Sequence, residues 1–92
     1  MIKSIKGSAT RHFIEQGKSK FSGLDADLAR QRLSELDAAT SLDAFGRLRS
    51  VRLHKLTGGL RDFWSINVND QWRILFKFKD GHAFEVHIAD PH

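Results

Sequence analysis

Apolar and polar residues alternate along most of the chain from residue 51 to residue 88, a period typical of β-strands that bury one face. The alternation is clearest over residues 63–68 and on both sides of Asp80 and Gly81. Asp-Gly favours a two-residue hairpin turn, and a second reversal is expected at Asn69 and Asp70, which tolerate a left-handed backbone. The pattern predicts a meander of at least three antiparallel strands.

The first half of the chain shows the apolar spacing of helices instead. A short helix is expected after Ser8 or Thr10, either of which could cap it, and Gly17 should end it. A second helix is expected over residues 25–39, where leucine and alanine recur every three or four positions. A short strand at residues 2–5 and a capped helical turn at residues 41–45 complete the predicted order, which places the helices before the meander.

The predicted strands can be sorted into two faces, because a one-residue slip in register would expose every core side chain. The sorting predicts an α+β fold in which two N-terminal helices pack on one face of a curled, mainly antiparallel β-sheet. The apolar face comprises Val51, Leu53, Trp64, Ile66, Val68, Trp72, Ile74, Phe76, Phe78, Phe84, Val86 and Ile88. The polar face comprises Arg52, His54, Ser65, Asn67, Arg73, Leu75, Lys77, Lys79, Glu85 and His87.

Length and composition narrow the class of protein. The 92 residues suit one domain over residues 1–92, and no repeat or linker divides them. The absence of cysteine excludes disulfides, thiolate zinc sites and a thiol nucleophile. The start does not resemble a signal peptide, and no segment approaches the roughly 20 apolar residues that cross a bilayer. A cytoplasmic protein without a membrane partner is therefore expected.

The net charge of +4 conceals an uneven distribution of charge along the chain. Between residues 47 and 79 there are eight lysines and arginines against two aspartates, whereas residues 24–45 are acidic. A polyanion such as RNA would favour the basic half. A solvated basic surface without a partner accounts for the same charge, so charge alone leaves both interpretations open.

Histidines and one arginine are the candidate chemical groups. The five histidines lack the His-x-x-x-His spacing of a helical metal site, so no native metal is expected. His54 and Arg73 share the polar face, and Asp90 and His92 can join them if the sheet curls and the chain end folds back. Such a set suits metal-free cleavage of RNA, in which acid, base and cation act on one phosphodiester. A solvated hairpin with a frayed tail is the non-catalytic alternative.

Several segments of the chain resemble the HigB branch of the RelE-like toxins, within the RelE/ParE superfamily. The resemblance rests on W-S-I-N-V-N-D-Q-W-R-I at residues 64–74, R-L-H-K-L at residues 52–56, L-D-A-A-T at residues 36–40 and the final D-P-H. It spans nearly the whole chain. It implies a toxin of a bacterial type II toxin–antitoxin system, a ribosome-dependent endoribonuclease that cuts translated mRNA in the A site and inhibits translation.

The resemblance also implies roles and partners. Arg73 would hold the scissile phosphate. The acid, base and positioning groups would be His54, Asp90 and His92, with no metal or other cofactor, and the products would carry 2′,3′-cyclic phosphate and 5′-hydroxyl ends. The implied partners are a HigA-like helix-turn-helix antitoxin, the ribosome and mRNA, with operator DNA bound only through the antitoxin complex. Candidate contacts to RNA phosphates are Arg47, Arg49, Arg52, Lys55, Arg61, Lys77 and Lys79.

Two positions depart from the family pattern. Pro91 stands where the family usually has tyrosine, which removes an aromatic platform and a hydroxyl. Thr57 stands where a lysine is common, and Lys55 or Arg61 could supply the missing charge. A weakened or inactive homologue that still binds antitoxin and ribosome is therefore an alternative to an active enzyme, and a stand-alone nucleic-acid-binding domain is a third interpretation.

Overall fold

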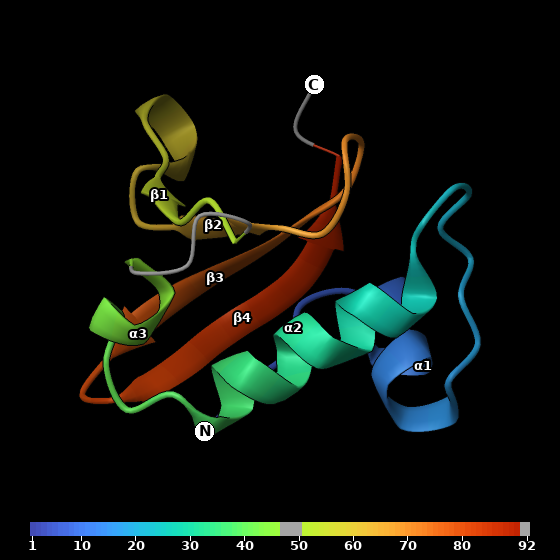
Figure 1. Ribbon diagram of the computed structural model, residues 1–92, viewed down its shortest axis with the longest axis horizontal. Helices are drawn as coiled ribbons and strands as arrows, with labels where there is room; N and C mark the ends of the chain where they lie inside the picture. Colours follow the sequence, from blue (N-terminus) through green and yellow to red (C-terminus); the bar gives the residue numbers. More distant parts are fainter. Residues whose placement is uncertain (47–50, 91–92) are drawn as a thin grey trace.

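The computed structural model describes residues 1–46 and 51–90, in which the helices precede a four-stranded sheet (Figure 1). The helices are α1 (Ser8–Gln16), α2 (Ala26–Ala38) and α3 (Asp43–Gly46), with a 3-10 helix, η1 (Gly58–Leu60), between the first two strands. The strands are β1 (His54–Lys55), β2 (Trp64–Asn67), β3 (Arg73–Lys79) and β4 (His82–Ala89). None of the helices in these described residues is long and apolar enough to cross a membrane.

The four strands pair only with their neighbours in sequence, in the order β1-β2-β3-β4, and every pair is antiparallel. The predicted meander is therefore confirmed. Asp80 and Gly81 close the β3–β4 turn with φ angles of 53° and 81°, the left-handed backbone that an Asp-Gly hairpin requires. The alternation from residue 51 onward suggests extended strand there, but β1 begins only at His54, because Arg52 adopts a φ of 49° that interrupts extended backbone.

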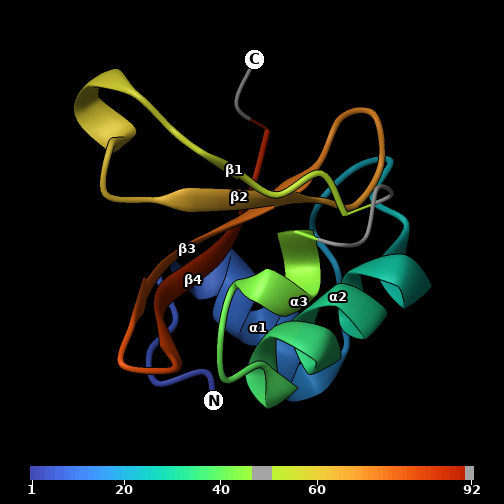
Figure 2. The ribbon, with the colours of Figure 1, turned by 60° about the vertical axis from the view of Figure 1, so that its left-hand side comes forward.

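Figure 2 shows the three helices gathered on one side of the sheet, which confirms the predicted α+β architecture. The core between the layers includes Phe13 from α1, Leu36 from α2 and Phe76 from β3, each at most 1% exposed. The expected strand at residues 2–5 is reduced to two parallel bridges, Ile2 to Ala83 and Ile5 to Val86, beside β4.

The two long helices begin differently from each other. Asp25 caps α2, since its carboxylate accepts a hydrogen bond from the Leu28 amide at 3.1 Å. Neither Ser8 nor Thr10 caps α1, because Gly7 occupies that position without a side-chain bond. Thr10 is instead buried, and its hydroxyl accepts a hydrogen bond from the Ile88 amide of β4 at 3.0 Å. The threonine therefore ties the helix to the sheet.

A bulge in β4 reverses the face on which one aromatic residue lies. Leu75 pairs with His87 but Lys77 pairs with Phe84, so β4 holds one more residue than β3 over this interval, and Glu85 has a φ of 51°. Phe84 consequently shares a face with Lys77. The prediction that Phe84 lies in the helix-covered core is wrong. It assumed strict alternation along the strand, and the extra residue of the bulge shifts this alternation by one position.

The face of the sheet turned away from the helices, called the outer face below, is less polar than predicted. Leu75 and Ser65 are 2% and 0% exposed, and Phe63 is buried above this side of the sheet. The Phe63 ring packs edge-on against His87, with ring centroids 5.5 Å apart. The middle of the outer face is therefore a small second cluster of packed side chains, with charged groups on either side of it.

Candidate active site

His54 and Arg73 contact each other on the outer face of the sheet. They belong to β1 and β3, which lie on opposite sides of β2, where His54 pairs with Ser65 and Arg73 with Asn67. Arg73 Nη1 lies 3.0 Å from His54 Nε2, so the arginine side chain spans β2 to reach the histidine. The structure thus brings together two of the four residues predicted as catalytic.

The direction of this hydrogen bond determines the form of the imidazole. A guanidinium group can only donate, so His54 Nε2 accepts and the ring is neutral, with its proton on Nδ1. A neutral imidazole has a lone pair that can take a proton from a hydroxyl, and the neighbouring cation can neutralise a phosphate. The pair therefore combines a base and an anion-binding group within one hydrogen bond.

The floor of the candidate site is a buried part of the sheet. Four residues paired in register form a row across the outer face: His54, Ser65, Leu75 and His87. The two central residues of the row are fully buried, and the hydroxyl of Ser65 has no hydrogen-bond partner among the described residues. His87 Nδ1 donates to the Glu85 carbonyl at 2.9 Å, which leaves its Nε2 as the acceptor when the ring is neutral.

Asp90 lies at the same end of the sheet as Arg73, because Ala89 is the register partner of Arg73. Figure 1 shows this end of β4 beside the turn between β2 and β3. Gln71, in that turn, donates from Nε2 to Asp90 Oδ2 at 3.3 Å. Gln71 belongs to the 64–74 motif that carries the family resemblance, but no role is predicted for it from the sequence. His92, the fourth predicted catalytic residue, lies outside the described residues.

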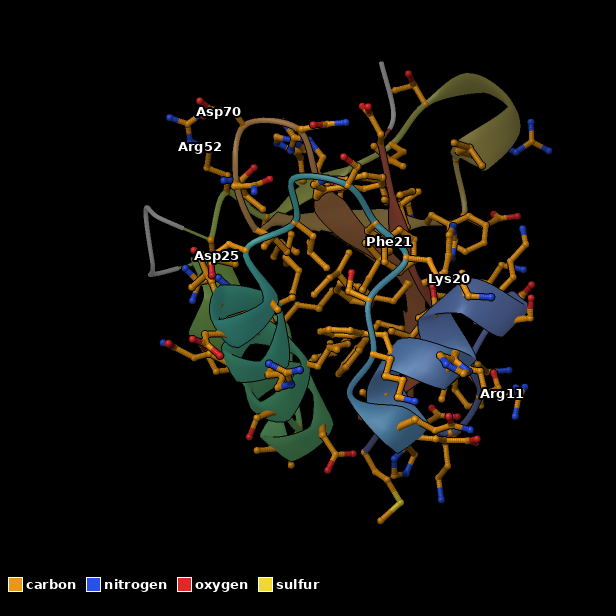
Figure 3. The ribbon with its side chains drawn as sticks, turned by 90° about the vertical axis from the view of Figure 1, so that its right-hand side faces the viewer. Arg11, Lys20, Phe21, Asp25, Arg52 and Asp70 are labelled. Carbon is orange, nitrogen blue, oxygen red and sulfur yellow. The ribbon has the colours of Figure 1, made fainter. Side chains whose placement is uncertain are left out.

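The β2–β3 turn is supported by the loop between α1 and α2. Trp72 Nε1 donates to the Ser22 carbonyl at 2.8 Å, and Asn69 Nδ2 donates to the Gly23 carbonyl at 2.9 Å. The Phe21 ring meets Trp72 edge-on at 5.2 Å, and Figure 3 shows Phe21 directed from the loop toward the strands. These contacts fix the turn that carries Gln71 and leads into Arg73.

The predicted phosphate-binding residues differ in their surroundings. Lys77 Nζ lies 2.6 Å from Glu85 Oε2; this hydrogen bond lowers the pKa of the Glu85 carboxyl and raises the pKa of the Lys77 ammonium. Lys55 Nζ lies 5.0 Å from the centre of the Trp64 ring. Among these predicted contacts, the exposed residues Arg52, Lys55, Arg61 and Lys79 have no ion pair within residues 1–46 and 51–90. Arg47 and Arg49 lie outside the described residues.

The described residues contain no cluster of three or more histidine, cysteine, aspartate and glutamate side chains arranged to hold a metal ion.

Thr57, where the family pattern favours lysine, is exposed before η1 and makes no capping hydrogen bond. Arg73 is the cation that contacts His54 directly within the described residues.

Comparisons with known proteins agree with the fold and the motifs. Residues 3–92 match a family described as the RelE-like toxin of type II toxin-antitoxin system HigB. The endoribonuclease HigB of Proteus vulgaris is 36% identical over 93 residues, which cover 100% of both proteins. The toxin HigB-1 of Vibrio cholerae serotype O1 is 36% identical over 62 residues, 67% of this chain and 64% of that protein.

Solved structures show the same fold at low sequence identity. The crystal structure of YafQ from E. coli aligns with a TM-score of 0.57 at 10% identity, and that of a YafQ mutant with a TM-score of 0.60 at 12% identity. Each alignment covers 99% of this chain and 94% of the YafQ chain. The arrangement of helices and sheet is therefore shared well beyond detectable sequence similarity.

Proposed function

The chain belongs to the HigB-like family of RelE-like toxins of type II toxin–antitoxin systems, and we propose that it is a ribosome-dependent endoribonuclease that cuts translated mRNA in the A site. The single observation that supports cleavage most directly is the contact between Arg73 Nη1 and His54 Nε2, at 3.0 Å on the outer face. The Proteus vulgaris relative bears the name endoribonuclease. Cutting messages on the ribosome would inhibit translation in the cytoplasm.

The proposed reaction begins at the ribose next to the scissile phosphate. His54 takes the proton of the 2′-hydroxyl on Nε2, and the 2′-oxygen attacks the phosphorus. Arg73 donates hydrogen bonds to the phosphate oxygens, where negative charge accumulates in the transition state. The bond to the 5′-oxygen breaks, and that oxygen takes a proton from His92, which Asp90 helps to orient. The products are a 2′,3′-cyclic phosphate and a 5′-hydroxyl.

Substrate binding and base activation are coupled in this mechanism. In the free chain the lone pair of His54 Nε2 is occupied by the Arg73 hydrogen bond. A bound phosphate offers Arg73 an anionic acceptor, and a hydrogen bond between arginine and an anion is stronger than one from arginine to a neutral imidazole. The arginine therefore turns toward the phosphate and releases the lone pair for the 2′-hydroxyl. The reaction needs no metal ion, since Arg73 supplies the positive charge.

A growth assay tests the assignment of Arg73. Inducing the native chain without antitoxin should arrest growth, whereas Arg73→Ala should restore it, because loss of one donor to a developing oxyanion slows catalysis by about 10²- to 10³-fold. Arg11→Ala, which removes an exposed arginine of α1, is the matched control and should stay toxic. Full toxicity of a folded Arg73→Ala chain would show that the site lies elsewhere.

The partners follow from the family. A HigA-like helix-turn-helix antitoxin would neutralise the toxin, and operator DNA would be bound only through the antitoxin complex. Co-expression with the neighbouring reading frame tests this, because a true antitoxin should restore growth and co-purify with the chain.

A second candidate function is a binding module that retains the antitoxin and ribosome surfaces but no longer cleaves. It is favoured by Pro91, which lacks the ring and hydroxyl of the tyrosine usual in the family, and by the exposed Thr57. Primer extension on translated messages separates the two functions, since only the enzyme leaves discrete cuts. Cuts that appear only after Pro91→Tyr would favour the binding module.

A further inference from the structure

Phe84 occupies a position that packing of the helix-covered core does not explain. The bulge at Glu85 turns it to the outer face, opposite Lys77, and it does not join the side chains packed against the core. Ala83 is the fully buried residue at this end of β4 instead. A half-buried aromatic ring therefore lies on the face of the sheet that also carries the candidate active site.

The ring lines a hollow near the β3–β4 turn. The hollow has a volume of about 450 Å³, within the roughly 300–1,000 Å³ of small-molecule sites, and is lined by Ser4, Lys77, Lys79, Phe84 and Glu85. Phe84 is the apolar member of this set. The hydroxyl of Ser4 accepts a hydrogen bond from the Glu85 amide at 2.8 Å, which fixes the N-terminal segment as one wall.

Two lysines and one glutamate line the hollow. Lys77 is paired with Glu85, and the ammonium groups of Lys77 and Lys6 lie 5.2 and 5.4 Å from the centre of the Phe63 ring. Lys79 is exposed and forms no ion pair within the described part of the chain, so it can bind an anion without first breaking a contact. An aromatic face beside an unpaired lysine suits a nucleotide, whose base stacks while its phosphate is neutralised.

The hollow lies along the same strand as the candidate active site. Arg73 and Lys79 are six residues apart on β3, so both point to the outer face and stand about 20 Å apart along the strand. We propose that this hollow is a subsite for one nucleotide of the mRNA that the chain cuts, a few nucleotides from the scissile bond. The base stacks on Phe84 and the phosphate contacts Lys79, an inference that rests on the proposed function.

The test uses the full chain and ribosomes programmed with a short message. A series of messages carries one abasic nucleotide each, at successive positions on both sides of the cut, and cleavage is followed as kcat/KM. One position should weaken cleavage by the native chain about 5-fold or more, the effect of losing one base–aromatic stack. Phe84→Leu should show a similar loss on the intact message and no further loss at that position, because both changes remove the same contact.

Further variants separate stacking from charge and from folding. Phe84→Trp keeps an aromatic face and should retain cleavage, and Ile14→Ala, an exposed apolar residue of α1, is the matched control. Lys79→Gln should weaken cleavage by an amount that shrinks as salt is raised, whereas Lys20→Gln in the α1–α2 loop should not. The abasic series on the native chain tests the subsite even where leucine destabilises the fold.

Three results would overturn the subsite. The first is that Phe84→Leu, folded by circular dichroism, cleaves every message as the native chain does. The second is a loss in Phe84→Leu that is equal at all abasic positions, since the ring then does not stack on the message. The third is weakened binding of antitoxin with unchanged cleavage, which would assign the surface to a protein partner. A native chain that cuts no intact message contradicts the proposed function instead.

Discussion

At the scale of single residues, the proposed chemistry depends on hydrogen bonds that orient a small number of groups. The Arg73 to His54 contact spans β2, and it requires both residues to lie on the same face of the sheet. Alternation in the sequence was sufficient to predict that shared face. It could not predict Gln71, because its contact with Asp90 joins a turn to the end of β4 and follows no period.

Gln71 acts in this account as a positioning residue for Asp90. Gln71→Ala should lower kcat by at most about 5-fold, the value of one exposed hydrogen bond, while KM stays nearly unchanged. The measurement is cleavage kinetics on programmed ribosomes, with Gln31→Ala on the exposed side of α2 as the control. An equal fall in kcat for both variants would argue against a positioning role.

The Lys77 to Glu85 pair should make a small contribution to stability that depends on pH. Because the pair lowers the pKa of the Glu85 carboxyl, it adds to the free energy of unfolding at pH values above the unfolded-state pKa of glutamate. This stabilisation is lost as the pH falls through the folded-state pKa of Glu85. Because the pair raises the pKa of the Lys77 ammonium, it also stabilises the fold at pH values below the unfolded-state pKa of lysine. This stabilisation is lost as the pH rises through the folded-state pKa of Lys77. The pair therefore stabilises the fold at pH values between the titration of Glu85 and the titration of Lys77.

Thermal melting of Glu85→Gln across pH checks this window. The native chain should melt slightly above the variant near neutral pH, and the difference should shrink as the carboxyl becomes protonated. The effect is small because the two side chains are 39% and 42% exposed. A difference that stays constant down to acidic pH would contradict the assigned cause.

At the scale of elements, the structure differs from the prediction where a single residue interrupts the alternation of a strand or takes the expected capping position of a helix. The Asp80 and Gly81 turn and the Asp25 cap of α2 carry local signals, so both were predictable. The bulge at Glu85 carries no such signal, since glutamate rarely adopts a positive φ. Its consequence is large, because it moves Phe84 from the expected core to the outer face.

The bond between α1 and β4 provides a test of the layer arrangement. Thr10→Val keeps the shape of the side chain but leaves the Ile88 amide without its partner, which should destabilise the fold by about 1–3 kcal/mol. Urea unfolding measures the loss, and Thr40→Val at an exposed position is the control. Equal stability of the two variants would mean that the buried bond contributes nothing.

At the scale of the whole molecule, the two faces of the sheet have separate tasks. Helices cover one face and enclose the core with it, while the outer face carries the contact between Arg73 and His54 and, at the hairpin end, the hollow at Phe84. Of the lysines and arginines in the basic half of the chain, Arg73, Lys77 and Lys79 lie on the outer face of β3. We therefore expect a message to lie along the outer face of the sheet, on the side opposite to the helices.

The most direct measurement follows one message on purified ribosomes with the native chain and with His54→Ala. The account predicts discrete cuts in the A-site codon that leave 2′,3′-cyclic phosphate and 5′-hydroxyl ends in the presence of a chelator. It also predicts a rate about 10²- to 10⁴-fold lower for His54→Ala, the usual effect of losing a general base. No cutting by the native chain, or equal cutting by the folded variant, would contradict the central claim.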